Sequence, residues 1–142
     1  MKIIIAGAGD VGSHLAKLLS SEFHDIYLLD ENEERLNTIS SQIDVFTIAG
    51  DAKSVEIMEQ KLISTCDLLI AVTSSEETNM LICILGKKLG AKHTIARIND
   101  DNIISENREH FYNELGIDTL ISPTHLACLL YTSDAADESR GV

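Results

Sequence analysis

The feature that most limits the fold of this chain is the regular alternation of short apolar runs with segments of helical periodicity. The apolar runs cover Lys2–Ala6, Asp25–Asp30, Asp44–Ala49, Asp67–Val72, His93–Ile98 and Asp118–Ser122. The helical patterns between them cover Val11–Ser20, Asn32–Ser40, Ser54–Leu62, Glu76–Leu89 and Asn102–Leu115. Strand–helix–strand units with near-continuous apolar strands build parallel sheets that are covered on both faces. The sequence therefore predicts a three-layered, doubly wound, Rossmann-like α/β fold with strand order 3-2-1-4-5-6.

The size and charge of the chain argue against several classes of protein. Its 142 residues suit one domain. A net charge of −12 repels nucleic-acid phosphates, so we expect no nucleic-acid partner. No apolar run approaches the roughly 18 residues of a membrane span. The start "MKIIIAGAGD" is broken by glycine and aspartate too early for a signal peptide. We therefore expect a cytoplasmic protein without direct insertion into a membrane.

The cysteines do not form a recognisable site. Cys66, Cys83 and Cys128 include no C-x-x-C pair, which argues against a disulfide framework and a thiolate zinc site. We interpret all three as small buried apolar residues, and we expect no metal centre.

The segment "GAGDVG" follows the first apolar run and opens the first helical pattern, which is the context of a phosphate-binding loop. In such a loop Gly7 permits a sharp turn, Gly9 allows a pyrophosphate to approach the backbone, and Gly12 lets the helix pack against the sheet. The N–H groups and the dipole at the start of the helix favour an anion. The alternative is a tight turn without a ligand.

Asp30 ends the second apolar run, at the distance beyond the last glycine where dinucleotide-binding folds place a ribose-binding acid. Its carboxylate can accept hydrogen bonds from both ribose hydroxyls of an adenosine and would repel a 2′-phosphate. This favours NAD over NADP. The alternative is an aspartate that begins a turn or caps the next helix.

Further candidates follow the third strand, at the edge of the sheet where open α/β folds bind ligands. These are Asp51 and Ala52, in "AGDA". Asp51 could meet the edge of an adenine or could cap the helix near Ser54, and the sequence leaves both open.

The fourth and fifth strands supply three more candidates, Thr73, Ser74 and Arg97. Ser74 and Glu77 fit a capping box at the start of a helix, which does not prevent Thr73 and Ser74 from facing a ligand. Arg97 could bind phosphate or ribose oxygens through its guanidinium, or could form a surface ion pair.

No catalytic constellation is evident. The chain contains no H-E-x-x-H, G-x-S-x-G or Walker-type motif, and we find no second domain to supply a substrate pocket. The predicted helix Glu76–Leu89 has consecutive apolar positions from Met80 to Leu85, more than one face of a sheet can cover. A subunit interface or deeper burial would account for the excess.

Together, "MKIIIAGAGDVG", "LLDENEERL", "AGDA", "LLIAVTSSEETNMLIC", "IARI" and "LISPTHL" resemble the N-terminal RCK (KTN) domain of the TrkA family of potassium-uptake regulators. The resemblance implies a non-enzymatic regulatory subunit, peripheral to the inner face of the membrane. It implies homo-oligomeric assembly on a potassium channel or transporter, controlled by NAD, NADH, ATP or ADP. The matching positions are Gly7, Ala8, Gly9, Asp10 and Val11 for the pyrophosphate, Asp30 for the ribose, and Thr73, Ser74 and Arg97.

The resemblance covers residues 1–127, which we expect to form the nucleotide-binding domain. Family members usually carry an RCK-C domain, which we do not find here. We expect the segment "CLLYTSDAADESRGV", residues 128–142, to be non-native or disordered. Two other interpretations stay open: the cofactor domain of an NAD-dependent oxidoreductase, and a free-standing NAD-binding module.

Overall fold

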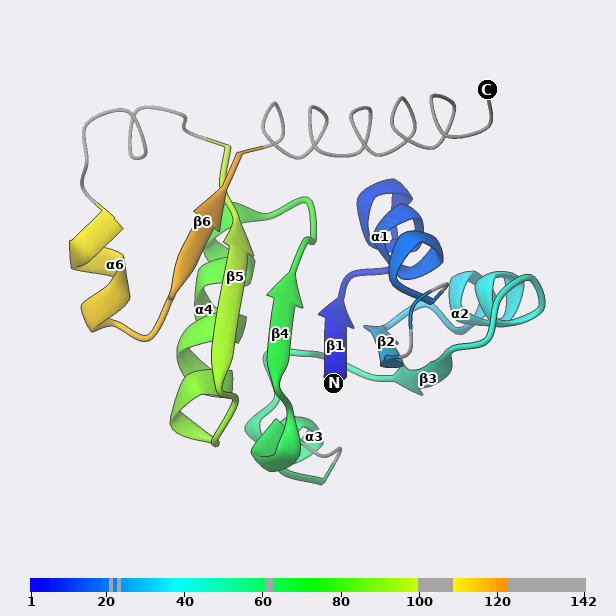
Figure 1. Cartoon of the computed structure of the whole chain (residues 1–142), viewed down its shortest axis with the longest axis horizontal. Coiled ribbons are helices and arrows are strands. Elements are labelled where there is room, and N and C mark those ends of the chain that lie inside the picture. Colours follow the sequence, from blue (N-terminus) through cyan, green and yellow to red (C-terminus); the bar gives the residue numbers. More distant parts are fainter. Residues whose placement is uncertain (21, 23, 61–62, 100–108, 123–142) are drawn as a thin grey trace.

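The computed structural model describes residues 1–20, 22, 24–60, 63–99 and 109–122. Its strands are β1 (Lys2–Ala6), β2 (Asp25–Asp30), β3 (Phe46–Ala49), β4 (Leu68–Ala71), β5 (His93–Arg97) and β6 (Thr119–Ile121). Its α-helices are α1 (Asp10–Ser20), α2 (Glu33–Ser40), α3 (Val55–Gln60), α4 (Glu76–Lys88) and α6 (Glu109–Glu114). All strand pairs are parallel, in the order β3-β2-β1-β4-β5-β6 (Figure 1). The predicted doubly wound fold is confirmed.

Where the structure describes a whole pattern, its element matches the predicted bounds to within one residue at each end, except in β3. β3 begins two residues later than predicted, at Phe46 and not at Asp44. Ladder pairing with β2 begins at Phe46, opposite Tyr27, so the two residues before it lie outside the sheet. Several earlier predictions fall outside the described residues: the first part of the helix Asn102–Leu115, Cys128, and the division at residue 127.

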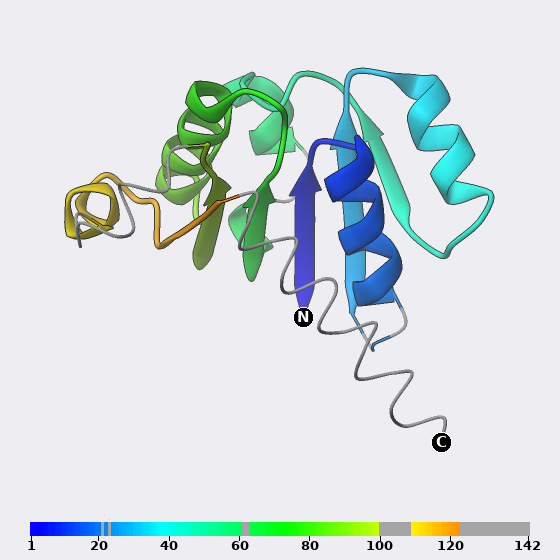
Figure 2. The ribbon, with the colours of Figure 1, turned by 90° about the horizontal axis from the view of Figure 1, so that it is seen from above.

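Successive side chains of β1 point to opposite faces of the sheet, so the core is divided into two clusters. Ile3 and Ile5 pack with Ala16 of α1 and Leu36 of α2. Ile4 faces the other way, in a cluster that also includes Met58 of α3 and Ile82 and Cys83 of α4. Figures 1 and 2 show α1 and α4 against opposite faces of the sheet, as expected of strands buried on both sides.

Two of the cysteines belong to this core. Burial raises the pKa of the Cys66 thiol to about 11 and that of the Cys83 thiol to about 12. Both are free thiols, and the Cys66 thiol donates to the carbonyl of Leu68. Both are fully buried, which confirms their interpretation as small buried residues, and their thiols are protonated at neutral pH.

The amino edge of the sheet is held by two carboxylates. Asp67 accepts hydrogen bonds from the backbone N–H of Lys2 at 2.8 Å and pairs with Lys92 Nζ at 3.1 Å. Asp118 accepts from the backbone N–H of Thr94 at 2.9 Å and from Lys87 Nζ at 2.8 Å. These contacts join neighbouring strands at the amino edge of the sheet and do not involve the carboxyl edge. Across the described ranges, no helix combines the length and the apolar character that crossing a bilayer requires.

Candidate functional site

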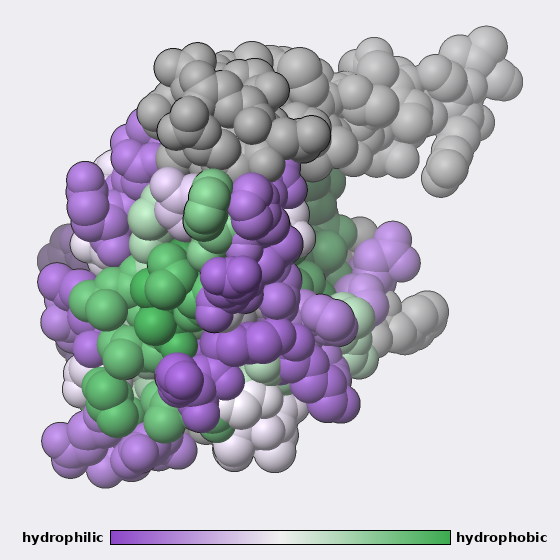
Figure 3. Space-filling model, turned by 90° about the vertical axis from the view of Figure 1, so that its left-hand side faces the viewer, coloured by the Kyte–Doolittle hydropathy of each residue, from purple (hydrophilic) through white to green (hydrophobic). Residues whose placement is uncertain are grey.

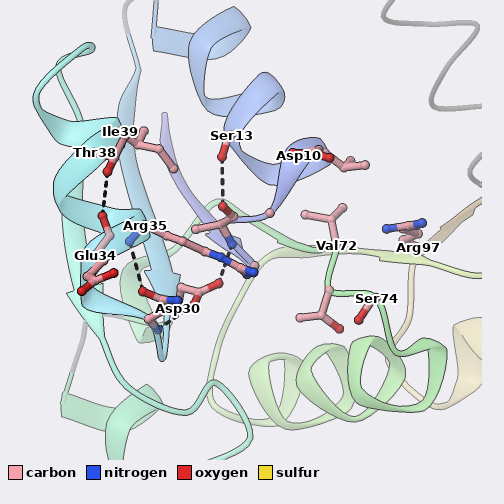
Figure 4. Close-up of a pocket in the computed structure, with 16 residues that line it drawn as sticks. Asp10, Ser13, Asp30, Glu34, Arg35, Thr38, Ile39, Val72, Ser74 and Arg97 are labelled. Carbon is pink, nitrogen blue, oxygen red and sulfur yellow. Dashed lines mark hydrogen bonds between the residues drawn. The ribbon is translucent and has the colours of Figure 1, made fainter.

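A cavity of about 790 Å³ opens at the carboxyl edge of the sheet, between the helices α1 and α2 and the ends of β4 and β5 (Figure 4). That volume lies within the range of about 300–1,000 Å³ typical of small-molecule pockets. The sequence candidates that line it are Gly7, Ala8, Gly9, Asp10, Val11, Asp30, Thr73, Ser74 and Arg97. The fold thus brings together residues from four strands at the edge where open α/β sheets bind ligands.

The three glycines of the loop have different roles. Gly7 has a φ of 114°, which L side chains rarely adopt, and its N–H donates to the carbonyl of Leu29 at 2.8 Å. A Cβ on Gly12 would collide with the carbonyl oxygen of Gly7. A Cβ on Gly9 would meet no atom within 4 Å. Gly7 and Gly12 therefore shape the turn, whereas Gly9 keeps open the space in front of it.

The loop leads directly into α1. The N–H of Ser13 donates to the carbonyl of Gly9 at 2.9 Å, and the Ser13 hydroxyl donates to the carbonyl of Ala8 at 3.0 Å. The first turn of a helix has amide N–H groups without intrahelical acceptors, and the helix dipole makes this end positive. The open space beside Gly9 is therefore suited to an anion such as a pyrophosphate.

The Asp30 carboxylate is fixed at the end of β2. Oδ2 accepts a hydrogen bond from the backbone N–H of Ala8, and Oδ1 accepts one from the backbone N–H of Asn32, both at 2.7 Å. Each carboxylate oxygen can accept a second hydrogen bond. Asp30 thus holds the glycine loop and can still accept from the hydroxyls of a ribose in the cavity.

Arg97 lies at the end of β5, and its guanidinium faces the cavity (Figure 4). Its Nε is buried and has no hydrogen-bond partner. A buried N–H without an acceptor costs about 1–3 kcal/mol, which a bound anion would recover. The surface ion pair that the sequence left open does not form among the described residues.

The loop after β4 differs from the prediction. The N-cap of α4 is Ser75, whose side chain accepts from the backbone N–H of Thr78, so the capping box of Ser74 and Glu77 is wrong. Ser74 is exposed and lines the cavity. Thr73 also lines it, but the N–H, hydroxyl and carbonyl of Thr73 are all bonded to Asn79. Hydrogen bonds to a ligand from this loop would therefore come from Ser74.

Asp51 and Ala52 lie in a second, smaller cavity of about 230 Å³. Gly7, Asp30, Thr73 and Ser74 line both cavities, so the two adjoin each other. Asp51 does not cap α3. Its Oδ1 accepts from the backbone N–H of Lys53 at 2.9 Å, and the Ser54 hydroxyl accepts from the N–H of Ile57 in the first turn of that helix. Asp51 instead lines the smaller cavity, which leaves the other interpretation, contact with the edge of an adenine, as the remaining prediction.

Sequence reasoning missed the contribution of α2. Glu34, Arg35, Thr38 and Ile39 line the larger cavity, as do Ser13, Asn32 and Val72. Arg35 extends from α2 into the cavity in Figure 4. Since residues three and four apart share a helix face, Arg35, Thr38 and Ile39 form one stripe. That spacing, directly after the ribose candidate Asp30, is the signal that could have identified them.

The ionisable side chains of the larger cavity are Asp10, Asp30, Glu34, Arg35 and Arg97. None of the described lining residues is a histidine or a cysteine, and His14, on α1, is exposed outside the cavity. No group of three or more histidine, cysteine or acidic side chains that could hold a metal ion occurs in the described ranges. The arrangement suits binding of a phosphorylated ligand.

Several solved structures share this fold. The TrkA-N domain of the Escherichia coli inner membrane protein ybaL superposes with a TM-score of 0.74, at 17% identity over 93% of this chain and 94% of that one. The GsuK channel bound to NAD gives 0.70, at 15% identity over 84% of this chain and 21% of that one. GsuK bound to ADP also gives 0.70, at 15% identity over 85% of this chain and 31% of that one.

Sequence comparison is more specific. The Trk system potassium uptake protein TrkA of Haemophilus influenzae is 41% identical over 128 residues, which are 89% of this chain and 28% of the relative. A TrkA homolog of Archaeoglobus fulgidus is 35% identical over 125 residues, 87% of this chain and 28% of the relative. The chain thus spans less than a third of the length of either. Residues 3–123 match the family model of the TrkA-N domain, and the chain belongs to this family.

Proposed function

We propose that this chain binds an adenine nucleotide and thereby regulates a membrane potassium channel or transporter. The observation that carries the proposal is the pair of adjoining cavities at the carboxyl edge. Their shared border includes Gly7 and the fixed carboxylate of Asp30, and the buried Nε of Arg97 lacks an acceptor at the larger cavity. This set provides an anion site, a ribose site and a further cation in one space.

The proposed ligand is NAD or NADH, with ATP or ADP as the alternative. The diphosphate would lie against the N–H groups that follow Gly9, the adenosine ribose on Asp30, and the adenine in the smaller cavity beside Asp51 and Ala52. The carboxylate of Asp30 would repel the 2′-phosphate of NADP. The related GsuK structures, one bound to NAD and another bound to ADP, support both classes of nucleotide.

We propose a regulatory role and not an enzymatic one. The curated relatives are named as potassium uptake proteins. The described lining of the two cavities has carboxylates, guanidiniums and Lys53 but no histidine, cysteine or tyrosine, the side chains that most often serve beside carboxylates and lysines in proton transfer. The chain would act at the cytoplasmic face of the membrane, peripherally bound to a pore subunit.

We also propose that the chain forms homo-oligomers through α4 and α6. Figure 3 shows hydrophobic side chains gathered on the side of the molecule where α4 and α6 lie in Figure 1. The exposed large apolar residues of these elements are Leu81 of α4, Phe111 of α6 and Leu115, which directly follows α6, and we call these three the α4–α6 patch. Ile82 and Cys83, in contrast, are buried, so only part of the apolar excess in α4 is covered by its own domain.

We assign the nucleotide-binding domain to residues 1–127 and place residues 128–142 outside it. The match to the TrkA-N family model supports this division, since it ends at residue 123.

The proposal is tested by calorimetric titration of the chain with NADH, NAD, NADPH, ATP and ADP. We expect binding of one or more of the nucleotides that lack a 2′-phosphate and weaker binding of NADPH. Asp30→Ala should cost about 1–3 kcal/mol of binding free energy, the scale of hydrogen bonds to a charged acceptor. Asp25→Ala, which removes an exposed carboxylate at the other end of β2, is the matched control. Equal affinities of the wild type and Asp30→Ala would contradict the assigned ribose site.

Oxidation of NADH with a panel of small carbonyl compounds separates the regulator from the oxidoreductase domain. We expect binding without turnover. Steady turnover would favour the enzyme.

A further inference from the structure

Asn79, in the second turn of α4, is 1% exposed and forms a dense set of hydrogen bonds. Its Oδ1 accepts from the N–H of Thr73 at 2.8 Å and from the Thr73 hydroxyl at 2.6 Å. Its Nδ2 donates to the carbonyl of Thr73 at 3.0 Å and to the carbonyl of Arg97 at 2.9 Å. One helical side chain therefore joins the residues that follow β4 to the last residue of β5.

The chemistry of this position requires an amide. The two groups facing Oδ1 can donate, and the two groups facing Nδ2 are carbonyls that can only accept, so the orientation of the amide is determined by its partners. An aspartate of the same shape would place an acceptor against both carbonyls. An apolar residue would leave four partly buried backbone or hydroxyl groups without this partner.

Asn79 also connects the cavity with the opposite side of α4. Thr73 lines both cavities and Arg97 lines the larger one. From the same helix, Ile82 lines the smaller cavity, while Leu81 is exposed in the α4–α6 patch. If the end of β4 or of β5 shifts relative to α4, a buried hydrogen bond of Asn79 must break or α4 must move as well.

We propose that Asn79 is a positioning residue that couples occupancy of the nucleotide site to the position of α4. This inference rests on the nucleotide binding proposed above and identifies how it would be regulated. Asn79 holds the backbone of Thr73 and Arg97 and does not itself line either cavity. By reciprocity, whatever displaces α4 changes nucleotide affinity by the same factor by which the nucleotide changes the equilibrium of α4.

The test is amide hydrogen exchange along α4, measured on the 142-residue chain without nucleotide and with saturating NADH or ATP, whichever binds the wild type. We expect the nucleotide to slow exchange at Met80–Lys88 in the wild type by about fivefold or more, the lower end of typical couplings. In Asn79→Asp at saturation, we expect the effect on α4 to be lost while slowing at the glycine loop remains.

Thr94→Val is the matched control. Thr94 is buried like Asn79, and its hydroxyl donates to the carbonyl of Gly116 at 2.6 Å near the amino end of β5, whereas Arg97 is at the carboxyl end. This variant loses that hydrogen bond and the one that the same hydroxyl accepts from the N–H of Asp118 at 3.0 Å, but we expect it to keep the nucleotide effect on α4. If Asn79→Asp does not fold, Asn79→Ser retains a hydroxyl and leaves room for water.

Slowing of α4 by nucleotide in both Asn79 variants, to the extent seen in the wild type, would overturn the inference. A wild type that binds nucleotide without any change in α4 would overturn it as well. If the wild type binds no nucleotide, the proposed function fails, and the ligand-free proteins still test the role of Asn79. In that case Asn79→Asp should speed amide exchange both at Ile98, which directly follows Arg97, and along α4, whereas Thr94→Val should not. Equal exchange rates in the two variants would refute the proposed role of Asn79.

Discussion

The carbonyl oxygen of Gly7 occupies the position that a Cβ on Gly12 would need, so the turn after β1 and the first turn of α1 are in direct backbone contact. Gly9, between them in sequence, faces open space. The G-x-G-x-x-G spacing therefore combines two glycines that the fold requires with one that the ligand would require. The two requirements can be separated by substitution.

We expect Gly12→Ala to affect mainly stability and Gly9→Ala to affect mainly nucleotide binding. Gly12→Ala creates a backbone clash and should lower the free energy of unfolding by about 1–3 kcal/mol, the usual cost of overpacking. Gly9→Ala should cost less than about 1 kcal/mol, the loss expected at a helix N-cap, but should weaken nucleotide binding because its methyl group projects into the cavity. Urea unfolding and calorimetric titration of both variants check this. Nucleotide affinity of Gly9→Ala equal to that of the wild type would mean that the phosphate does not lie there.

The sequence predicts the sheet well because its signals are local. Each strand is a short apolar run whose alternate residues reach two buried faces, as Ile4 and Ile5 do, and the connections are long enough to be helices. The parallel pairing then follows from the helical crossovers, and the strand order from their right-handedness together with the pattern of doubly wound folds. Even the glycine loop and Asp30 come together as their spacing predicts.

The loop after β4 could not be predicted in the same way. Two serines and two glutamates stand together in "SSEE", and the capping-box pattern selects Ser74 with Glu77. The structure selects Ser75 because Thr73 is bonded to Asn79, which fixes where the helix begins. That contact depends on the tertiary position of β5, since Asn79 also holds the carbonyl of Arg97. A pattern limited to neighbouring residues does not contain it.

Arg97→Met should weaken nucleotide binding without lowering the stability of the fold. Methionine keeps an apolar stem of similar length and removes the buried Nε that has no partner in the free protein. We therefore expect the free energy of unfolding to stay within about 0.5 kcal/mol of the wild type or to rise. Nucleotide affinity should fall about tenfold or more, because a charged hydrogen bond to phosphate or ribose is lost.

Lys17→Met is the charge-matched control for Arg97→Met. Lys17 is exposed on α1 and is not among the residues that line either cavity. Equal affinity losses in the two variants would show that only the overall charge matters. Thermal unfolding and calorimetry supply the two measurements.

Leu81→Glu should weaken self-association. Leu81 is 42% exposed in the α4–α6 patch, so a carboxylate there faces water in the monomer but would be buried in an interface. Val55→Glu is the matched control, since Val55 is 43% exposed but belongs to α3 and is not one of the patch residues. We expect light scattering to show a lower molar mass at a given concentration for Leu81→Glu alone. A wild-type mass for Leu81→Glu would place the interface elsewhere.

Stability at acid pH should depend on Asp67. The backbone N–H of Lys2, and next to it the side chain of Lys92, hold the pKa of this carboxyl below its ordinary value. Because the folded state binds the proton less readily than the unfolded state, the contribution of Asp67 to stability is complete above about pH 5 and is lost as the pH falls through about 4 toward the lower folded pKa.

Asp67→Asn still offers an acceptor to Lys2 but has no carboxylate to titrate. Urea midpoints measured from pH 7 to pH 2 should therefore fall more steeply for the wild type than for Asp67→Asn. Asp44→Asn, at an exposed position, should follow the wild type, and parallel curves for all three proteins would exclude a specific role of Asp67 at the amino edge.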